Sequence, residues 1–183
     1  MKSLTRFAQS VQFFKIKSSK RYKKQNLPFD ISLRLKQVSK LVICLPNEPS
    51  EAELACQIIP KLQLSLSPCA ITLIYKEESL SPRIKLSNVD VLSYSNDEVS
   101  RFNMPKKAFI QKFVHSSFDL VIDLSLPFQF TNVMIAWLCG APLRVGFYHP
   151  DREAFYNFLV RQKNETSLLN SYESLVNYLI SFR

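Results

Sequence analysis

The chain has 183 residues, of which 46% are hydrophobic and 21% are charged, a balance typical of one globular domain. No apolar run reaches the roughly 20 residues that span a bilayer. The basic N-terminus is not followed by an apolar stretch with a cleavage site, so we expect neither a membrane-spanning nor a secreted protein. The formal charge of +9 is concentrated at one end, because residues 1–40 hold 11 of the 24 Lys and Arg and 1 of the 15 Asp and Glu. We therefore expect a near-neutral body preceded by a basic segment.

The first residues predict an amphipathic basic helix over residues 3–24, followed by a linker that Pro28 helps to define. Apolar residues at helical spacing place one face at Leu4, Phe7, Ala8, Val11 and Phe14. That face either docks on the rest of the chain or contacts a partner. The candidates for contact with an anionic membrane surface, a protein partner or RNA phosphates are Lys15, Lys17, Lys20, Arg21, Lys23 and Lys24. The adjacent Phe13 and Phe14 favour docking or membrane contact over RNA.

The body alternates between apolar strands and helices. Strands are expected at residues 41–45, 70–75, 89–92, 120–124 and 143–147. Helices are expected after a Ser50–Glu53 capping box with a break at Pro60, and at 105–116, 129–139, 152–161 and 166–181. Gly140 is a natural stop for the third of these. The pattern predicts a three-layer α/β/α Rossmann-like domain with a mostly parallel sheet at residues 39–183, after a leader helix and linker at 1–38.

Two passages carry a family resemblance. Residues 118–124 (FDLVIDL) and 138–147 (LCGAPLRVGF) resemble a passage in the N-terminal half of the heptosyltransferases, family 9 of the glycosyltransferases. In that family the C-terminal half binds the sugar nucleotide, and an aspartate in a Gly-Asp loop after the first strand is the proposed base. The loop here, residues 45–50, contains no Gly-Asp, and Glu48 is its carboxylate. Other passages, at 102–106, 122–124, 145–147 and 155–159, resemble a family of short bacterial proteins of unknown function.

The candidate site lies at the carboxyl edge of the predicted sheet, where open α/β sheets bind ligands. Asp123 and Ser125 end the fourth strand, and Asp119 lies on the same side of that strand as Asp123, as a carboxylate pair would require. His149 follows the fifth strand. Arg144, within that strand, is expected to pair with one of the aspartates, to lie on an edge strand or to contact an acidic ligand.

No cofactor or metal is expected. Glycine is absent after the first strand, so the backbone there cannot cradle a phosphate closely. The four cysteines form no C-x-x-C pair and lie far in sequence from both histidines, so they are interpreted as buried free thiols at Cys44, Cys56, Cys69 and Cys139.

We accordingly expect a non-catalytic binding or interaction domain in the cytoplasm, or peripheral at the inner membrane. One alternative is a glycosyltransferase-like enzyme that acts on cell-envelope sugars, with a partner chain supplying the donor half. Its chemistry would come from Glu48, Asp123 or His149, and its ligand contacts from Asp123, Ser125 and Arg144. The other alternative is a membrane or RNA adaptor that uses the basic helix.

Overall fold

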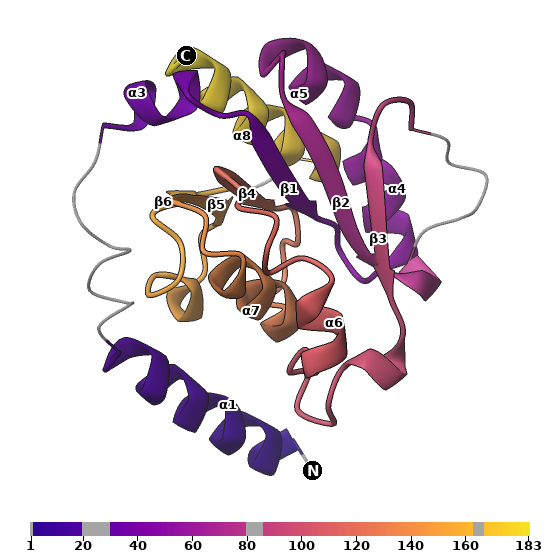
Figure 1. The fold of residues 1–183 in the computed structure, drawn as a ribbon, viewed down its shortest axis with the longest axis vertical. Helices are drawn as coiled ribbons and strands as arrows, with labels where there is room; N and C mark the ends of the chain where they lie inside the picture. The colour runs from indigo at the N-terminus through magenta and orange to yellow at the C-terminus, as the bar shows by residue number, and fades with distance from the viewer. Residues whose placement is uncertain (1, 20–29, 80–85, 163–166) are drawn as a thin grey trace.

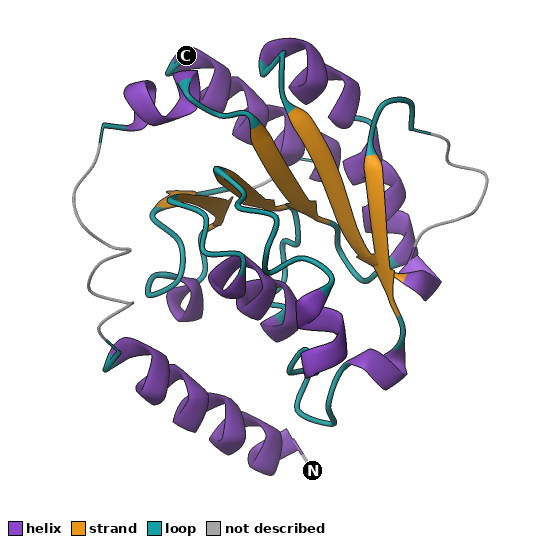
Figure 2. Cartoon of the chain, in the orientation of Figure 1, coloured by secondary structure: helices purple, strands orange, loops and turns teal. Residues whose placement is uncertain are grey.

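A sheet of six strands forms the centre of the protein, and helices cover both of its faces (Figures 1 and 2). The computed structural model describes residues 2–19, 30–79, 86–162 and 167–183. The strands are β1 (Lys40–Cys44), β2 (Ala70–Lys76), β3 (Asp90–Tyr94), β4 (Leu120–Asp123), β5 (Leu143–Phe147) and β6 (Phe158–Val160). The helices are α1 (Lys2–Lys17), α3 (Ile31–Lys36), α4 (Pro49–Cys56), α5 (Ile59–Ser65), α6 (Lys107–Gln111), α7 (Phe130–Leu138) and α8 (Leu168–Ser181).

The strand order is β3-β2-β1-β4-β5-β6, and every described pair is parallel. The predicted Rossmann-like fold and its five strands are therefore confirmed. Strands β4 and β5 are buried at every position, which explains why both are mostly apolar in the sequence, apart from Asp123 and Arg144. The order reverses between β1 and β4, so a crevice is expected where their carboxyl ends diverge.

Two apolar cores lie on the two faces of the sheet. Helices α3, α4, α5 and α8 cover one face, where Leu35 of α3 and Leu175 of α8 are buried in the same cluster. Helices α6 and α7 cover the other face with Phe109 and Ile135, and Phe13 of α1 packs against that cluster. Both faces of the central strands are thus removed from water, as is typical of a parallel sheet, while the edge strand β3 stays partly exposed.

Several local predictions are confirmed. Helix α4 ends at Cys56 and α5 begins at Ile59, so the chain breaks beside Pro60 as expected. Gly140 follows α7 with a φ of 70°, a conformation that costs glycine little. All four cysteines are free, and Cys69 is the one that is half-buried rather than buried. None of the described helices is both long and apolar enough to cross a bilayer.

Two helix starts differ from the prediction. Glu48, not Ser50, is the N-cap residue of α4. Pro49 takes the first helical position, so the helix begins two residues earlier than predicted. The capping box that the structure does contain joins Ser95 and Glu98. The helix expected over 105–116 is short, since Pro105 forms an antiparallel bridge with Val99 instead of the first helical turn.

The helix predicted over 152–161 is wrong. A single 3-10 turn (Pro150–Arg152) is followed by the sixth strand, β6. Asn157 explains the change, because its side chain makes two hydrogen bonds at the amino end of β5. Its Oδ1 accepts from the Arg144 N–H at 2.8 Å and its Nδ2 donates to the Pro142 carbonyl at 2.8 Å. The side-chain amide holds the segment extended where local propensity alone allows a helix.

The inward face of α1 also differs from the prediction. Phe13 and Ile16 pack against the core, while Val11 is 38% exposed and Phe14 is 75% exposed. The side chains of Leu4 and Phe7 lie outside the described residues. Phe13 and Phe14 are adjacent, so apolar spacing alone leaves the helix phase ambiguous by about 100°. The contact of Phe13 with the rings of Phe130 and Phe155 decides which face of α1 points inward.

Asp119 fastens the amino ends of β1 and β4 together. Its Oδ2 accepts from the Ser39 N–H at 2.9 Å, the Ser39 hydroxyl at 2.8 Å and the Lys40 N–H at 3.0 Å. Burial alone would raise the pKa of Asp119, but these hydrogen bonds outweigh it and the pKa is lowered. Asp119 is therefore bound at the opposite end of the strand from Asp123, and the two carboxylates do not form the pair that the sequence suggested.

Asp119 makes the free energy of unfolding depend on pH in the acidic range. Because its folded-state pKa is depressed, its contribution is complete above the unfolded carboxyl pKa of about 4 and is lost as pH falls through the folded value. We expect Asp119→Asn, which cannot titrate, to cost roughly 1 kcal/mol at neutral pH. Urea unfolding from neutral to acidic pH should show the gap to wild type closing as pH drops. A constant gap would contradict this role.

Candidate functional site

The carboxylate of Asp123 lies at the switch point of the sheet, beside Cys44 on β1, and is fully buried. Its Oδ1 accepts from the Ser125 N–H at 3.0 Å, from the Ser125 hydroxyl, and from Asn132 Nδ2 at 3.3 Å. Its Oδ2 accepts from the Tyr156 hydroxyl at 2.7 Å. Every donor comes from a segment that follows a strand or from α7, so this one carboxylate joins several segments at the carboxyl edge of the sheet.

Arg152 supplies the matching charge. Its Nη2 lies 3.6 Å from Asp123 Oδ2, and both side chains are fully buried. The same nitrogen donates to the Ser125 hydroxyl at 2.9 Å and to the Pro127 carbonyl at 2.8 Å, and Nη1 donates to the Phe147 carbonyl at 3.0 Å. A buried charge pair is tolerated when further hydrogen bonds satisfy most of its remaining polar atoms. These bonds satisfy Nη1 and Nη2, whereas Arg152 Nε is buried without a hydrogen-bond partner among the described residues. The Arg152–Asp123 pair thus fills the place where a ligand would otherwise reach the sheet.

Tyr156 closes the cluster from the side. Burial first, and then the Asp123 carboxylate, raise the pKa of Tyr156 well above its ordinary value, although Arg152 opposes them. The hydroxyl therefore stays protonated and donates. Its ring lies over Gly146, where an added Cβ would be 3.3 Å from two ring carbons. Burial, and then Asp123, raise the pKa of the Cys44 thiol as well, so this cysteine is not an activated nucleophile.

A cavity of about 240 Å³ remains outside this cluster, at the same edge of the sheet. Its lining consists of amide, aromatic and hydroxyl side chains from α1, the loops after β1 and β4, the segment before α6, and α7: Gln9, Asn47, Asn103, Phe128, Gln129, Phe130 and Thr131. Asn47 is oriented by Tyr94, whose hydroxyl donates to its Oδ1 at 3.0 Å. The lining contains no acid or base among the described residues.

The predicted site residues occupy three different environments. Glu48 is exposed at the N-cap of α4. His149 is half-buried, stacks on the Phe128 ring at 5.1 Å and accepts from the Asp151 N–H through Nδ1 at 3.2 Å. Asp123 and Ser125 share the buried cluster. The structure therefore does not bring Glu48, Asp123 and His149 together around the cavity.

The environment expected for Arg144 is wrong in two respects. Strand β5 is not an edge strand, because β6 pairs outside it. The partner of Asp123 is Arg152, whereas Arg144 donates from Nε to the Phe155 carbonyl at 2.6 Å and from Nη1 to the Ala141 carbonyl at 2.7 Å. Its guanidinium also lies 5.9 Å from the Trp137 ring centroid. Arg144 is fully buried, and its two hydrogen bonds join the loop after α7 to the loop before β6.

The basic residues at the end of the leader helix are partly described. Lys15 and Lys17 are exposed in the last turn of α1, while Lys20, Arg21, Lys23 and Lys24 lie outside the described residues. Phe13 docks the helix on the carboxyl edge of the sheet. Its ring centroid lies 4.7 Å from Phe155 and 5.4 Å from Phe130. Gln9 Nε2 adds a hydrogen bond of 3.3 Å to the Phe102 carbonyl.

Sequence reasoning missed one further carboxylate near this edge. Glu51, in the first turn of α4, has a raised pKa because of burial and then because of Glu48. Its Oε2 and the Tyr172 hydroxyl are both buried without a hydrogen-bond partner among the described residues. No local pattern in the sequence marks Glu51, because its burial depends on the packing of α4 in three dimensions. Arg152 and Tyr156 were missed because they fell within the wrongly predicted helix.

A family model of unknown function, DUF6913, matches residues 12–182. The chain belongs to this family. No curated protein matches it in sequence.

Several solved structures that resemble this DUF6913 chain are glycosyltransferases. A family 9 glycosyltransferase from Veillonella parvula superposes with a TM-score of 0.59 at 17% identity, over 77% of this chain and 41% of its own. The E. coli heptosyltransferase WaaC, solved with ADP, gives 0.59 at 12% identity over 79% and 48%. E. coli ADP-heptose heptosyltransferase II gives 0.56 at 14% over 75% and 40%. This chain thus has a glycosyltransferase-like fold, resembles the N-terminal half of those proteins and spans less than half of their length.

Removing one partner of the buried pair should be costly. We expect Asp123→Ala and Arg152→Met each to lower the free energy of unfolding by about 3–5 kcal/mol, because each leaves an uncompensated buried charge. The double variant should lose less than the sum. Urea unfolding measures this, with Glu78→Ala, in an exposed pair with Lys76, as the control at under about 1 kcal/mol. Equal costs for the buried and exposed pairs would contradict the assignment.

Proposed function

We propose that this chain is a non-catalytic binding module built on a glycosyltransferase-like scaffold. The observation that supports the proposal is that buried side chains close the carboxyl edge of the sheet. Asp123, at the position where open α/β sheets bind ligands, is fully buried and bound to four side chains, including Arg152. A carboxylate so occupied cannot serve a substrate as a base without dismantling the cluster.

The cavity beside the cluster supports the same proposal. Its amides can hold a neutral polar group, but among the described residues its lining offers no side chain that could abstract or donate a proton near neutral pH. Helix α1 also lies over this edge through Phe13, which is packed against Phe130 and Phe155. Glu48 and His149, the remaining candidates for an enzyme, line the outside of this arrangement and not the cavity.

A sugar-nucleotide assay separates the module from the enzyme. The full chain is incubated with a panel of sugar nucleotides including ADP-heptose, and thermal shift and nucleotide release are measured beside E. coli WaaC as the positive control. We expect neither a saturable shift nor release above buffer. Release that Glu48→Gln or His149→Ala reduces at least about tenfold, as removal of a general base does, would overturn the proposal. Both residues are outside the core, so both variants should fold.

The outer face of α1 is the part of the module that we assign to partner contact, and the partner we favour is an anionic membrane surface. Phe14 is 75% exposed and lies next to Lys15, with Val11 one turn earlier and Lys17 in the same last turn. An exposed aromatic side chain among cations fits a lipid interface, where the ring enters the acyl boundary and each cation contributes about 1 kcal/mol. The inner face is already occupied by Phe13, so membrane contact leaves the docked helix in place.

Vesicle binding tests this contact. The full chain is titrated with phosphatidylcholine vesicles that contain or lack phosphatidylglycerol, at low and high salt. We expect binding to the anionic vesicles alone, weakened about tenfold by Phe14→Ser and by the Lys15→Glu/Lys17→Glu pair. Matched controls are Leu64→Ser, another largely exposed apolar residue, and Lys106→Glu/Lys107→Glu, which changes the charge equally. Equal loss in the controls, or binding to RNA but not to vesicles, would contradict the membrane contact.

A further inference from the structure

The outer edge of β6 carries peptide groups without a strand partner in the described part of the chain. Strand β6 is the last strand of the sheet and pairs with β5 alone (Figure 2). The Tyr148 N–H donates to the Val160 carbonyl at 2.9 Å, so that carbonyl faces β5. Carbonyls alternate in direction along a strand, so the Leu159 carbonyl faces outward. The trans peptide bond turns the Arg161 N–H opposite to the Val160 carbonyl, so that N–H faces outward as well. Such an edge is a template for another extended segment.

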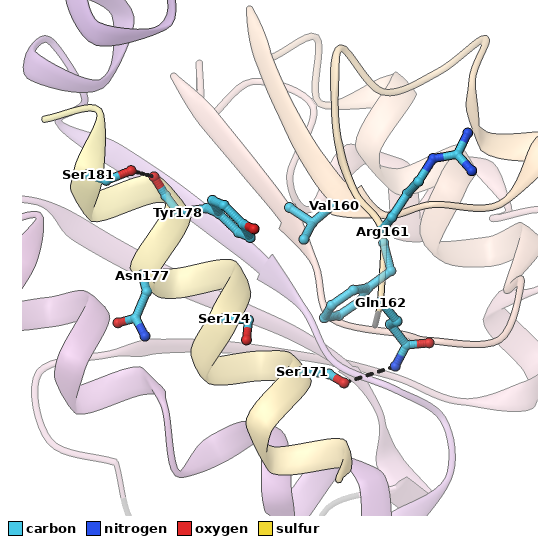
Figure 3. Close-up of a pocket in the computed structure, with 9 residues that line it drawn as sticks. Val160, Arg161, Gln162, Ser171, Ser174, Asn177, Tyr178 and Ser181 are labelled. Carbon is cyan, nitrogen blue, oxygen red and sulfur yellow. Dashed lines mark hydrogen bonds between the residues drawn. The ribbon is translucent and has the colours of Figure 1, made fainter. Parts of the chain in front are cut away.

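A groove of about 330 Å³ lies beside this edge, between β6 and α8 (Figure 3). Phe147 and Val160 supply its apolar part, and Tyr178 of α8 faces Val160 across it. The rest of the helical wall is made of small polar side chains: Ser171, Ser174, Asn177 and Ser181. Gln162 Nε2 donates to the Ser171 hydroxyl at 3.0 Å and joins strand to helix at one end. Small side chains on the helix leave room for a neighbouring chain to approach the edge.

Arg161 places a positive charge on the opposite side of the strand. Its guanidinium stacks on the Tyr148 ring at 3.9 Å, and its side chain points away from the groove (Figure 3). None of the described carboxylates lies within ion-pair distance of it. Arg161 follows the last residue of β6 and borders the groove beside Val160, and its guanidinium extends from there toward Tyr148. A strand added to this edge would meet an apolar pocket and a cation on alternate residues.

We propose that the β6 edge and the groove beside α8 bind an extended peptide from a partner protein, which joins the sheet as a seventh strand. One apolar side chain of the peptide occupies the groove between Val160 and Tyr178, and an adjacent acidic residue faces Arg161. Main-chain hydrogen bonds to the outward Leu159 carbonyl and Arg161 N–H supply affinity, and the groove and the cation supply specificity. The site is independent of the membrane contact of α1, which lies over the other face of the sheet.

The test uses the full chain and fluorescein-labelled octapeptides of β-forming sequence, in which a central Leu is followed by Glu, Gln or Lys. Fluorescence polarisation should give the order Glu, Gln, Lys from tightest to weakest. Arg161→Gln should abolish this preference and leave the Gln peptide unchanged. Arg161→Pro, which also removes an outward N–H, should weaken all three peptides about tenfold or more. Amide resonances of Leu159 and Arg161 should shift on binding.

A second pair of variants tests the groove. Ser174→Trp places an indole in the space that the apolar side chain needs, and should weaken the Leu–Glu peptide about tenfold. Glu173→Trp, one residue earlier and outside the lining, is the matched control and should bind as wild type. The proposal is overturned if no peptide binds, or if binding survives both Arg161→Pro and Ser174→Trp. It is also overturned if light scattering shows that the edge is occupied by a second copy of the chain, through a dimer that Arg161→Pro dissociates.

Discussion

The ion pair between Asp123 and Arg152 lies where water does not reach it, and this burial dictates the arrangement of the carboxyl edge. Each charge needs compensating hydrogen bonds, and the donors and acceptors come from Ser125, Asn132, Tyr156 and the carbonyls of two loops. Meeting that need draws the segments after β4 and β5 toward α7. The closed edge is therefore a consequence of satisfying one buried carboxylate, and the cavity that remains is lined by amides instead of charges.

The closure moves the accessible chemistry of this chain to its periphery. Helix α1 covers the carboxyl edge with Phe13 and presents Phe14 to solvent. A second accessible surface is the side of β6 that pairs with no strand in the described part of the chain. These two surfaces lie on different layers of the fold, so a contact at one leaves the other accessible. A scaffold shared with enzymes is compatible with such use, because fold alone does not determine chemistry. The division of the chain at residue 38 stays a prediction, although Leu35 of α3 is buried with the main core.

The sheet was predictable because its central strands are buried on both faces and so appear as short apolar runs, as at residues 120–122. The sixth strand was not, because the side-chain amide of Asn157 binds β5 across a long separation in sequence, and no local pattern reports that. The phase of α1 depended on which of two adjacent phenylalanines met an aromatic surface. Asp123 and Ser125 were correctly placed at the edge of the sheet, but their partner Arg152 could be found only in three dimensions, because tertiary contacts override the local preference.

The close approach of Tyr156 to Gly146 has a consequence for recognising this architecture elsewhere. A Cβ at position 146 would lie 3.3 Å from two carbons of the tyrosine ring, so the ring whose hydroxyl binds Asp123 would have to shift. Asp-x-Ser at the end of the fourth strand, glycine inside the fifth, and Arg-x-x-x-Tyr shortly after it therefore form one interdependent signature. A genome search for this combination would separate chains whose carboxyl edge is closed by the Asp123–Arg152 cluster from chains of the same fold that keep an open cleft.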